Sequence, residues 1–391
     1  MSKGHLRSRL VMASLALALG VANGCASDTP TAIPRVTQPT DLPSQPTPSE
    51  EPPSEEPQGN GSDETGDRGR GPRAVGTLVD LLEVPWGVDF LPDGNAVVTE
   101  RISGRVLRVT PDGLLSRLGT LSAAVPEGEA GLLGVAVSPD FDTDRTLFFY
   151  LTTGTDNRVV SARLDRTTLG EPTVVLDGIP RGFIHDGGRI AFGPDGHLYV
   201  TTGETGDPEL AQDPDSLAGK ILRITPDGVP APGNPDADSP VWTLGHRNVQ
   251  GLAWDDEGRL WASEFGDSEF DELNLVEKGG NYGWPEVEGV GGRSQYVDPQ
   301  LVWPVEQASP SGLAYADGHL WMAGLRGQRL WRINVSAAGK ASRPTAWFTE
   351  DYGRLRTVAA APDGRLWLTT SNRDGRGDPS PDDDRIILIR P

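Results

Sequence analysis

His185 is the side chain in this sequence best suited to acid–base chemistry. It lies in the stretch Ile184–Val200, just before two short apolar runs that are joined by Pro194-Asp195-Gly196. The alternation of apolar residues around that turn predicts a β-hairpin, with His185 on the loop entering its first strand. A sheet can aim a loop side chain into a cleft, and a neutral imidazole can accept a proton from a hydroxyl group. Considered alone, such a histidine more often simply packs on its loop, so the hypothesis of a catalytic base depends on the rest of the chain.

The internal repeat of the sequence separates histidines at repeated turn positions from candidates for chemistry among the five histidines of the chain. His197 and His319 follow an Asp-Gly pair at the same point of two repeat units, where other units have Asn or Arg. That position is therefore predicted to be an exposed turn. His5 lies near the N-terminus, in the signal described below. His185 and His246 remain as candidates for chemistry.

The repeat also predicts the architecture that must position these residues. Each unit has a short apolar strand, a turn that is usually Asp-Gly, a second strand, a variable loop and a third strand, as in 90–109. Six such units recur at roughly 45–60 residues, and no long stretch has the period of a helix. The sequence therefore predicts an all-β fold, a six-bladed β-propeller over residues 75–391. Loops of a propeller meet on its axis, so residues from distant blades can form one site.

Residues 1–25 differ from the rest of the chain. Basic residues precede an apolar run from Leu10 to Val21, which is typical of a secretory signal and too short for a membrane span. The single cysteine, Cys25, lies where a bacterial lipoprotein signal has its lipidated cysteine; the alternative is an ordinary cleaved signal. We therefore expect an exported protein without disulfides, anchored at the cell surface as a lipoprotein or secreted in soluble form.

Residues 26–74 are rich in Pro, Ser, Thr, Glu and Asp and nearly lack large apolar side chains. Such a segment cannot bury enough surface to offset its ordering entropy, so it is predicted to be a disordered tether. The net charge of −21 argues against nucleic acid or an anionic membrane surface as a partner. Contact with a membrane is expected only through a lipid anchor.

Several loops are dense in glycine and polar residues, and they carry a family resemblance. The sequences GHRNVQGL (residues 245–252) and GGNYGWP (residues 279–285) resemble signature loops of the soluble quinoprotein sugar dehydrogenases, the glucose/sorbosone dehydrogenase family. The resemblance runs from Leu82 to near the C-terminus. It implies a six-bladed propeller that uses pyrroloquinoline quinone (PQQ) and calcium. The implied reaction oxidises aldose sugars at C1 to lactones and passes electrons to an external acceptor.

The resemblance gives roles to three residues near the reacting atoms. It implies that His185 is the general base for the C1 hydroxyl of the sugar. Arg247 and Asn248 match the pair that contacts the quinone oxygens. A fixed guanidinium there would stabilise the charge that develops during hydride transfer, which makes Arg247 a catalytic candidate as well. The alternative for Arg247 is a structural ion pair.

Further residues match contacts to the cofactor and the substrate. PQQ carries three carboxylates, and Arg326, Arg354 and Arg356 match basic contacts to it. Arg354 and Arg356 alternate along a predicted strand and so share one face, which points either to the axis or to solvent. Glu129 and Trp303 match residues on the substrate side, and Trp303 is equally suited to a core.

Calcium is expected to take oxygen ligands, partly from backbone carbonyls. By the same resemblance, Gly266 and Asp267 offer carbonyls to an ion that bridges to the cofactor and acts on it as a Lewis acid. Glu272 and Tyr282 match a second, structural calcium site, the tyrosine through its carbonyl.

Some positions depart from the family pattern and leave alternatives open. Phe265 stands where Gln or His is usual, and Asp267 replaces a common proline. Asp186 replaces Asn or Gln and could hold His185 if it turned inward. Phe265 favours a non-catalytic propeller that binds a glycan or protein at the cell surface. A calcium-dependent lactonase is a third hypothesis, but it needs several carboxylates converging on one axial metal, where this sequence places arginines.

Overall fold

A computed structural model describes residues 71–391. The predicted signal over residues 1–25, with Cys25, and the predicted tether as far as residue 70 lie outside the described residues. Within residues 71–391, no helix has the length and apolar character needed to cross a membrane.

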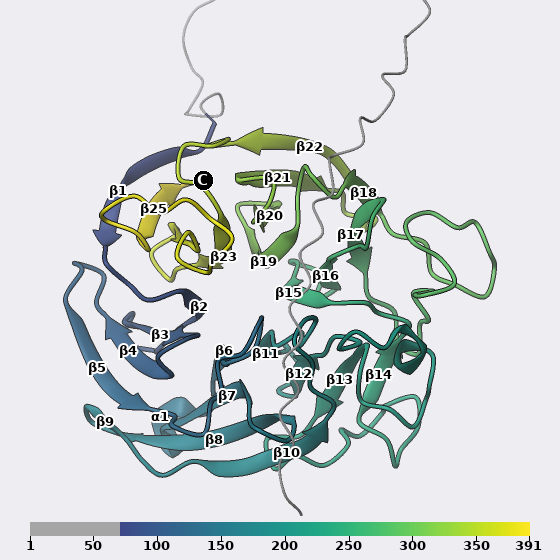
Figure 1. The fold of residues 1–391 in the computed structure, drawn as a ribbon, viewed down its shortest axis with the longest axis horizontal. Coiled ribbons are helices and arrows are strands. Elements are labelled where there is room, and N and C mark those ends of the chain that lie inside the picture. The colour runs from purple at the N-terminus through teal and green to yellow at the C-terminus, as the bar shows by residue number, and fades with distance from the viewer. Residues whose placement is uncertain (1–70) are drawn as a thin grey trace, which may run out of the picture. The chain divides into compact units, whose positions relative to one another are not determined.

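The described chain forms six antiparallel sheets arranged as a ring of blades, so the predicted six-bladed β-propeller is confirmed (Figure 1). The first strand of each blade lies at the centre of the ring. The innermost strands are β2 (Pro85–Phe90), β6 (Leu132–Val137), β11 (Ile190–Phe192), β15 (Val249–Trp254), β19 (Pro310–Ala316) and β23 (Leu355–Ala360).

Two further strands of each blade follow the innermost strand as hairpins. The second strands are β3 (Ala96–Glu100), β7 (Thr146–Thr152), β12 (Leu198–Thr201), β16 (Leu260–Glu264), β20 (His319–Gly324) and β24 (Leu366–Thr370). The third strands are β4 (Arg105–Val109), β8 (Asn157–Asp165), β13 (Lys220–Ile224), β17 (Phe270–Leu275), β21 (Arg329–Val335) and β25 (Ile386–Arg390).

Each blade also has a fourth, outermost strand, which the sequence units did not include. These strands have mostly exposed or half-buried side chains, as in β5, so they lack the apolar alternation that marks the inner strands. The outermost strands are β5 (Leu115–Thr120), β10 (Thr173–Ile179), β14 (Val241–Leu244), β18 (Leu301–Pro304), β22 (Ala341–Trp347) and β1 (Arg73–Val79). The minor elements are β9 (Thr168–Leu169), which pairs with β8, α1 (Phe141–Asp144) and the 3₁₀ helix η1 (Pro208–Ala211).

The first and last strands of the described chain close the ring. β1 pairs antiparallel with β25 and completes the blade of β23, β24 and β25 (Figure 1, purple beside yellow). The paired region begins at Arg73, two residues before the boundary at 75 suggested by the sequence, because Arg73 and Ala74 pair with Arg390 and Ile389.

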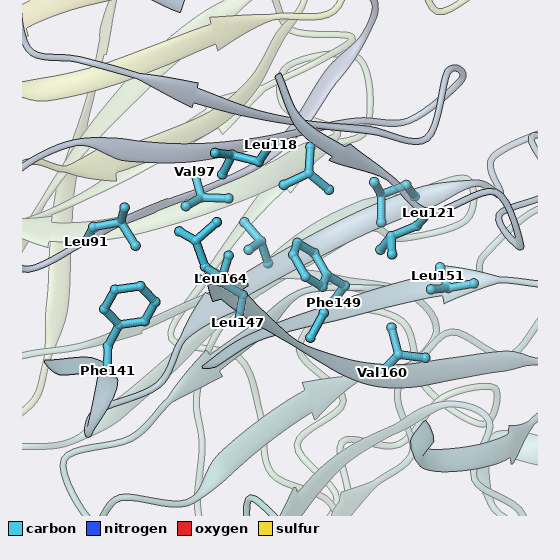
Figure 2. Packing of buried hydrophobic residues seen from close by; sticks show 14 residues of the cluster. Leu91, Val97, Leu118, Leu121, Phe141, Leu147, Phe149, Leu151, Val160 and Leu164 are labelled. Atoms are coloured by element: carbon cyan, nitrogen blue, oxygen red, sulfur yellow. The ribbon is translucent and has the colours of Figure 1, made fainter. Parts of the chain in front are cut away.

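Hydrophobic cores lie between neighbouring blades. Alternate residues of one strand face the two neighbouring blades, because successive side chains of a strand point to opposite faces. On β3, Val97 packs towards the blade of β6 (Figure 2), whereas Ala96 and Val98 pack towards the closing blade. Burying a side chain such as Phe149 stabilises the fold by about 1.5–3 kcal/mol, so each blade is held mainly by its neighbours.

The predicted hairpin that follows His185 is present. Ile190 pairs with Val200 and Phe192 with Leu198. Gly196 in its turn has φ of +74°, a conformation that glycine adopts without steric cost. The loop before β11 therefore enters the innermost strand of a blade, which brings His185 to the axis.

Candidate active site

A cavity of about 370 Å³ lies at the end of the axis where the innermost strands begin. That volume is in the range of small-molecule sites, roughly 300–1,000 Å³. Loops of all six blades contribute to its wall. The lining residues are Arg101, Gly128, Glu129, Ile184, His185, Asn248, Gln250, Phe265, Ser309, Leu325, Arg326, Arg354, Arg356, Asp374 and Arg376.

His185 lines this cavity and is held at three points. Its backbone N–H donates to Glu129 (3.0 Å), its carbonyl accepts from Thr205, and its Nδ1 contacts the carboxylate of Glu204. A carboxylate can only accept, so Nδ1 carries the proton of a neutral ring and Nε2 has the free lone pair. His185 thus has the form of a general base whose second nitrogen is fixed by a buried acid.

Glu204 is a candidate functional residue that the sequence analysis missed. Its side chain is 2% exposed, and its other oxygen accepts the backbone N–H of Gly206 (2.6 Å). The available signal was its place in Thr202-Gly203-Glu204-Thr205-Gly206, a glycine-rich loop directly after β12. Gly203 is required there, because a Cβ atom would lie 1.9 Å from the carbonyl oxygen of His185.

Replacing Glu204 with glutamine is expected to lower kcat on the order of 10²-fold, because the amide no longer fixes the tautomer of His185 or stabilises its protonated ring. The Michaelis constant and the affinity for the cofactor should stay close to the original values. Steady-state kinetics and a binding titration measure both. Glu127→Gln, at an exposed ion pair with Arg181, is the control. An unchanged kcat in Glu204→Gln would contradict the assigned role.

Asp186 does not turn towards the imidazole, contrary to the possibility raised by the sequence. One of its oxygens accepts from the side chain of Asn157 (2.9 Å) and the backbone of Gly182 (3.0 Å). Burial raises the pKa of Asp186 to about 6. Glu204, rather than Asp186, is the carboxylate that contacts His185.

His246 lies in the interior rather than at the cavity. Its ring contacts Thr243 (2.9 Å) and Glu264 (2.8 Å) and stacks on Tyr282 with centroids 4.6 Å apart. Both ring nitrogens have partners, so His246 has a structural position. Of the two candidate histidines, the structure brings His185 to the cavity.

The predicted arginines Arg326, Arg354 and Arg356 all line the cavity. Arg354 donates to Asp374 (3.0 and 3.1 Å), and Arg356 donates to Gln250 (2.9 Å) and lies 3.5 Å from Asp374. Although burial opposes it, Arg356 and then Arg354 hold the pKa of Asp374 below its usual range. Arg326 is exposed and makes no ion pair within residues 71–391.

Two further arginines that the sequence did not single out join this group. Arg101 donates to the carbonyl of Gly128 (2.6 Å), and Arg376 pairs with Glu129 (2.7 Å). The cavity wall thus contains five arginines and two carboxylates. This excess of positive charge suits an anionic ligand, although the whole chain is acidic.

Asn248 lines the cavity and Arg247 does not. The side-chain oxygen of Asn248 accepts the backbone N–H of Gly187 (3.1 Å). The guanidinium of Arg247 instead pairs with Asp267 (2.9 Å) and lies 5.3 Å from the ring centroid of Trp284. The guanidinium of Arg247 thus lies at a neighbouring, smaller pocket, and the catalytic and cofactor-binding roles of this residue stay predictions.

The two residues expected on the substrate side have different positions. Glu129 lines the cavity beside His185. Trp303 lies on β18, the outermost strand of its blade, where it is 3% exposed and packs 5.7 Å from Trp331. The expectation that Trp303 contacts substrate is therefore wrong, since the side chain belongs to the core between two blades.

The smaller pocket, of about 10 Å³, brings together Gly266, Glu272 and Tyr282, three of the four residues expected to bind calcium. The fourth, Asp267, lies beside it through its pair with Arg247. Glu272 pairs with Glu264 across β16 and β17, and burial and then Glu264 raise the pKa of Glu272 to about 8. No group of three His, Cys, Asp or Glu side chains suited to a metal converges anywhere in residues 71–391.

Residues 82–388 match the family model for Glucose / Sorbosone dehydrogenase. The chain belongs to the glucose/sorbosone dehydrogenase family. The resemblance seen in the sequence is thus confirmed, and so is the prediction that the protein is an enzyme, an oxidoreductase of the sugar dehydrogenase type.

Solved structures and characterised relatives agree with this family. The chain is similar to the PQQ-bound form of an aldose sugar dehydrogenase from Streptomyces coelicolor, with 52% identity and a TM-score of 0.80 over 82% of this chain and 98% of that one. It is 35% identical to quinoprotein glucose dehydrogenase B of Acinetobacter calcoaceticus over 56% of this chain and 54% of the relative. It is 29% identical to an aldose sugar dehydrogenase of Escherichia coli over 77% and 91% of the two chains.

Proposed function

We propose that this family member oxidises aldose sugars at C1 to lactones, with PQQ as cofactor and His185 as general base. The observation that carries the proposal is the juxtaposition of a carboxylate-held histidine and five arginines around one cavity. A relative with 52% identity binds PQQ, which supports the same cofactor here.

The cavity fits PQQ by charge and by donor chemistry. The cofactor is flat and carries three carboxylates, and Arg326, Arg354 and Arg356 would hold them. The Nε atoms of Arg101 and Arg356 are buried without a hydrogen-bond partner in residues 71–391, so these donors are available for an anion. When bound, PQQ supplies the acceptor for the hydride that C1 of the sugar loses.

His185 performs the proton transfer of this reaction. As the C1–H bond breaks, Nε2 accepts the hydroxyl proton, and the electron pair of the O–H bond forms the carbonyl of the lactone. Glu204 stabilises the positive imidazolium that results. Glu129 holds the loop through the N–H of His185, which keeps the ring on the cavity wall.

We also propose that calcium binds at the smaller pocket. Glu272 and the carbonyl of Tyr282 would bind the structural ion, and the carbonyls of Gly266 and Asp267 would face the ion expected beside the cofactor. All are oxygen ligands of the kind that calcium prefers. The phenol of Tyr282 already bonds to Leu275 and to the N–H of Glu277, which leaves its carbonyl for this purpose. The buried pair of Glu264 and Glu272 needs a neutralising cation or proton.

Removing calcium is expected to make stability depend on pH through Glu272. Because its pKa in the folded protein is raised to about 8, the free energy of unfolding should fall as pH rises from the ordinary glutamate range of about 4.3 to about 8. Calcium should restore the lost free energy of unfolding at alkaline pH, since it takes the place of the proton on Glu272. Thermal unfolding with EDTA or calcium chloride tests this, with Glu272→Gln expected to abolish both effects.

The matched control for this experiment is Glu257→Gln, at an exposed carboxylate that pairs with Arg259. It should keep both the pH dependence and the stabilisation by calcium. A Glu272→Gln protein that calcium still stabilises as strongly as the original would contradict the proposed site.

Reconstitution tests the function as a whole. The purified protein is incubated with PQQ and calcium and then offered aldoses and a dye acceptor. Reduction of the dye together with formation of the lactone is expected, and a glycan-binding propeller without catalysis would give neither. Export, a lipid anchor at Cys25 and an external electron acceptor remain proposals that rest on the sequence.

A further inference from the structure

Arg189 lies on the axis, one layer of side chains beneath the active-site cavity. It directly precedes β11 and is 9% exposed. Its Nε donates to the carbonyl of Gln250 (2.8 Å), its Nη2 donates to Thr357 (3.0 Å), and its guanidinium lies 4.3 Å from the ring centroid of Trp86. These partners come from three other blades. Gln250 lines the active-site cavity, whereas Arg189 and Thr357 line a wider opening of about 850 Å³ at the opposite end of the axis.

Within the described part of the chain, Arg189 is a buried arginine without a counter-ion, whereas Arg223, Arg354 and Arg356 each lie within 4 Å of a carboxylate. No carboxylate in residues 71–391 lies within ion-pair distance of it. Arg223, by comparison, is equally buried over aromatic rings but pairs with Asp195 (2.7 Å). An unpaired buried cation is costly, and burial followed by the charge of Arg356 lowers the pKa of Arg189 to about 9. A fold that keeps such a charge on its axis is suited to an anion nearby.

Two residues, Gln250 and Trp86, connect Arg189 to the wall of the cavity. The carbonyl of Gln250 accepts from Arg189, and its side-chain oxygen accepts from Arg356 (2.9 Å). Trp86 lies close to both guanidinium groups, at 4.3 Å from that of Arg189 and 5.9 Å from that of Arg356. Arg356 is therefore held partly by contacts that it shares with Arg189.

We propose that Arg189 is a positioning residue for the anionic cofactor. Its buried positive charge strengthens the binding of a multiply charged anion in the cavity above, and its contacts with Thr357 and Trp86 hold in place two residues that adjoin Arg356. This inference rests on the proposed PQQ-dependent function. It does not require Arg189 to touch the cofactor.

A PQQ titration of the calcium-loaded apoprotein, followed by absorbance, tests the proposal. Arg189→Gln removes the charge and should raise the dissociation constant of PQQ at least about tenfold, which corresponds to about 1.4 kcal/mol. Arg189→Lys keeps a positive charge when the titration is done at a pH well below the ordinary lysine pKa of about 10.4. Its dissociation constant for PQQ should then stay within about threefold of the original value. The control Arg223→Gln should lower the melting temperature without changing PQQ affinity.

The outcomes separate the inference from the function on which it rests. If the original protein binds PQQ and Arg189→Gln binds it equally well, the inference is overturned and the proposed function stands. If Arg189→Gln and Arg189→Lys lose affinity equally and both melt earlier, Arg189 only joins the blades, and the inference is again overturned. If the original protein does not bind PQQ, both fail.

Discussion

Replacing His185 with asparagine is expected to lower kcat by about 10²–10⁴-fold while the affinity for PQQ stays unchanged. The substitution removes the basic nitrogen that accepts the proton. It leaves the affinity for PQQ intact because His185 contributes none of the positive charge that holds the cofactor. Asparagine is the suitable substitute because His185 has φ of +58°, and asparagine tolerates this left-handed conformation better than alanine. Stopped-flow reduction of the bound quinone by an aldose, together with a PQQ titration, measures the two effects separately.

The matched control for this substitution is His197→Asn. His197 sits on the turn of the same hairpin, at the far end of β11, where it contacts Arg223. Its replacement should leave kcat unchanged. A His185→Asn protein that reduced the quinone at the original rate would show that another group accepts the proton.

Replacing both Arg354 and Arg356 with glutamine is expected to raise the dissociation constant of PQQ by about 10²–10⁴-fold, since each hydrogen bond to a charged group contributes about 1.5–3 kcal/mol. Both side chains line the cavity, and both are nearly buried. The double substitution leaves the buried carboxylate of Asp374 without its two arginine partners. A triple variant that also carries Asp374→Asn therefore checks that the loss of PQQ affinity is not due to misfolding.

Arg365→Gln is the surface control for the arginine pair, because Arg365 lies on an Asp-Gly turn and pairs with Asp363. It should bind PQQ as the original protein does. Unchanged PQQ affinity in the variant that lacks Arg354 and Arg356 would contradict the proposed role of these arginines in binding the cofactor.

The sequence was sufficient for the fold because alternation within strands and the repeated turns are both local signals. Val97 and its neighbours alternate between two inter-blade cores, and this pattern is readable from the chain alone. The outermost strands were missed because their side chains face solvent, as in β22, and their pairing depends on a neighbouring strand rather than on their own composition.

The site was predictable where a residue lies within a few positions of the start of an innermost strand. His185, Asn248, Arg354 and Arg356 occupy such positions and line the cavity. Arg247 is the instructive exception, since it is adjacent to Asn248 in sequence yet pairs with Asp267, a contact that only the folded chain reveals. Family position alone could not indicate this.

Contacts between residues far apart in the sequence lay beyond prediction for the same reason. Glu204 meets His185 across 19 residues, and Arg189 meets Thr357 across 168. Trp303 was instead assigned to the cavity although it lies in a core. A tryptophan next to a proline suits a core as well as a substrate surface, and only its buried place on an outermost strand decides between them.

A crystal structure of the protein with PQQ and an aldose tests the central claim most directly. The account predicts the quinone in the cavity at the start of the innermost strands, its carboxylates against Arg326, Arg354 and Arg356, and Nε2 of His185 facing the C1 hydroxyl. PQQ bound in the wider opening at the opposite end of the axis, or a sugar out of reach of His185, would contradict it.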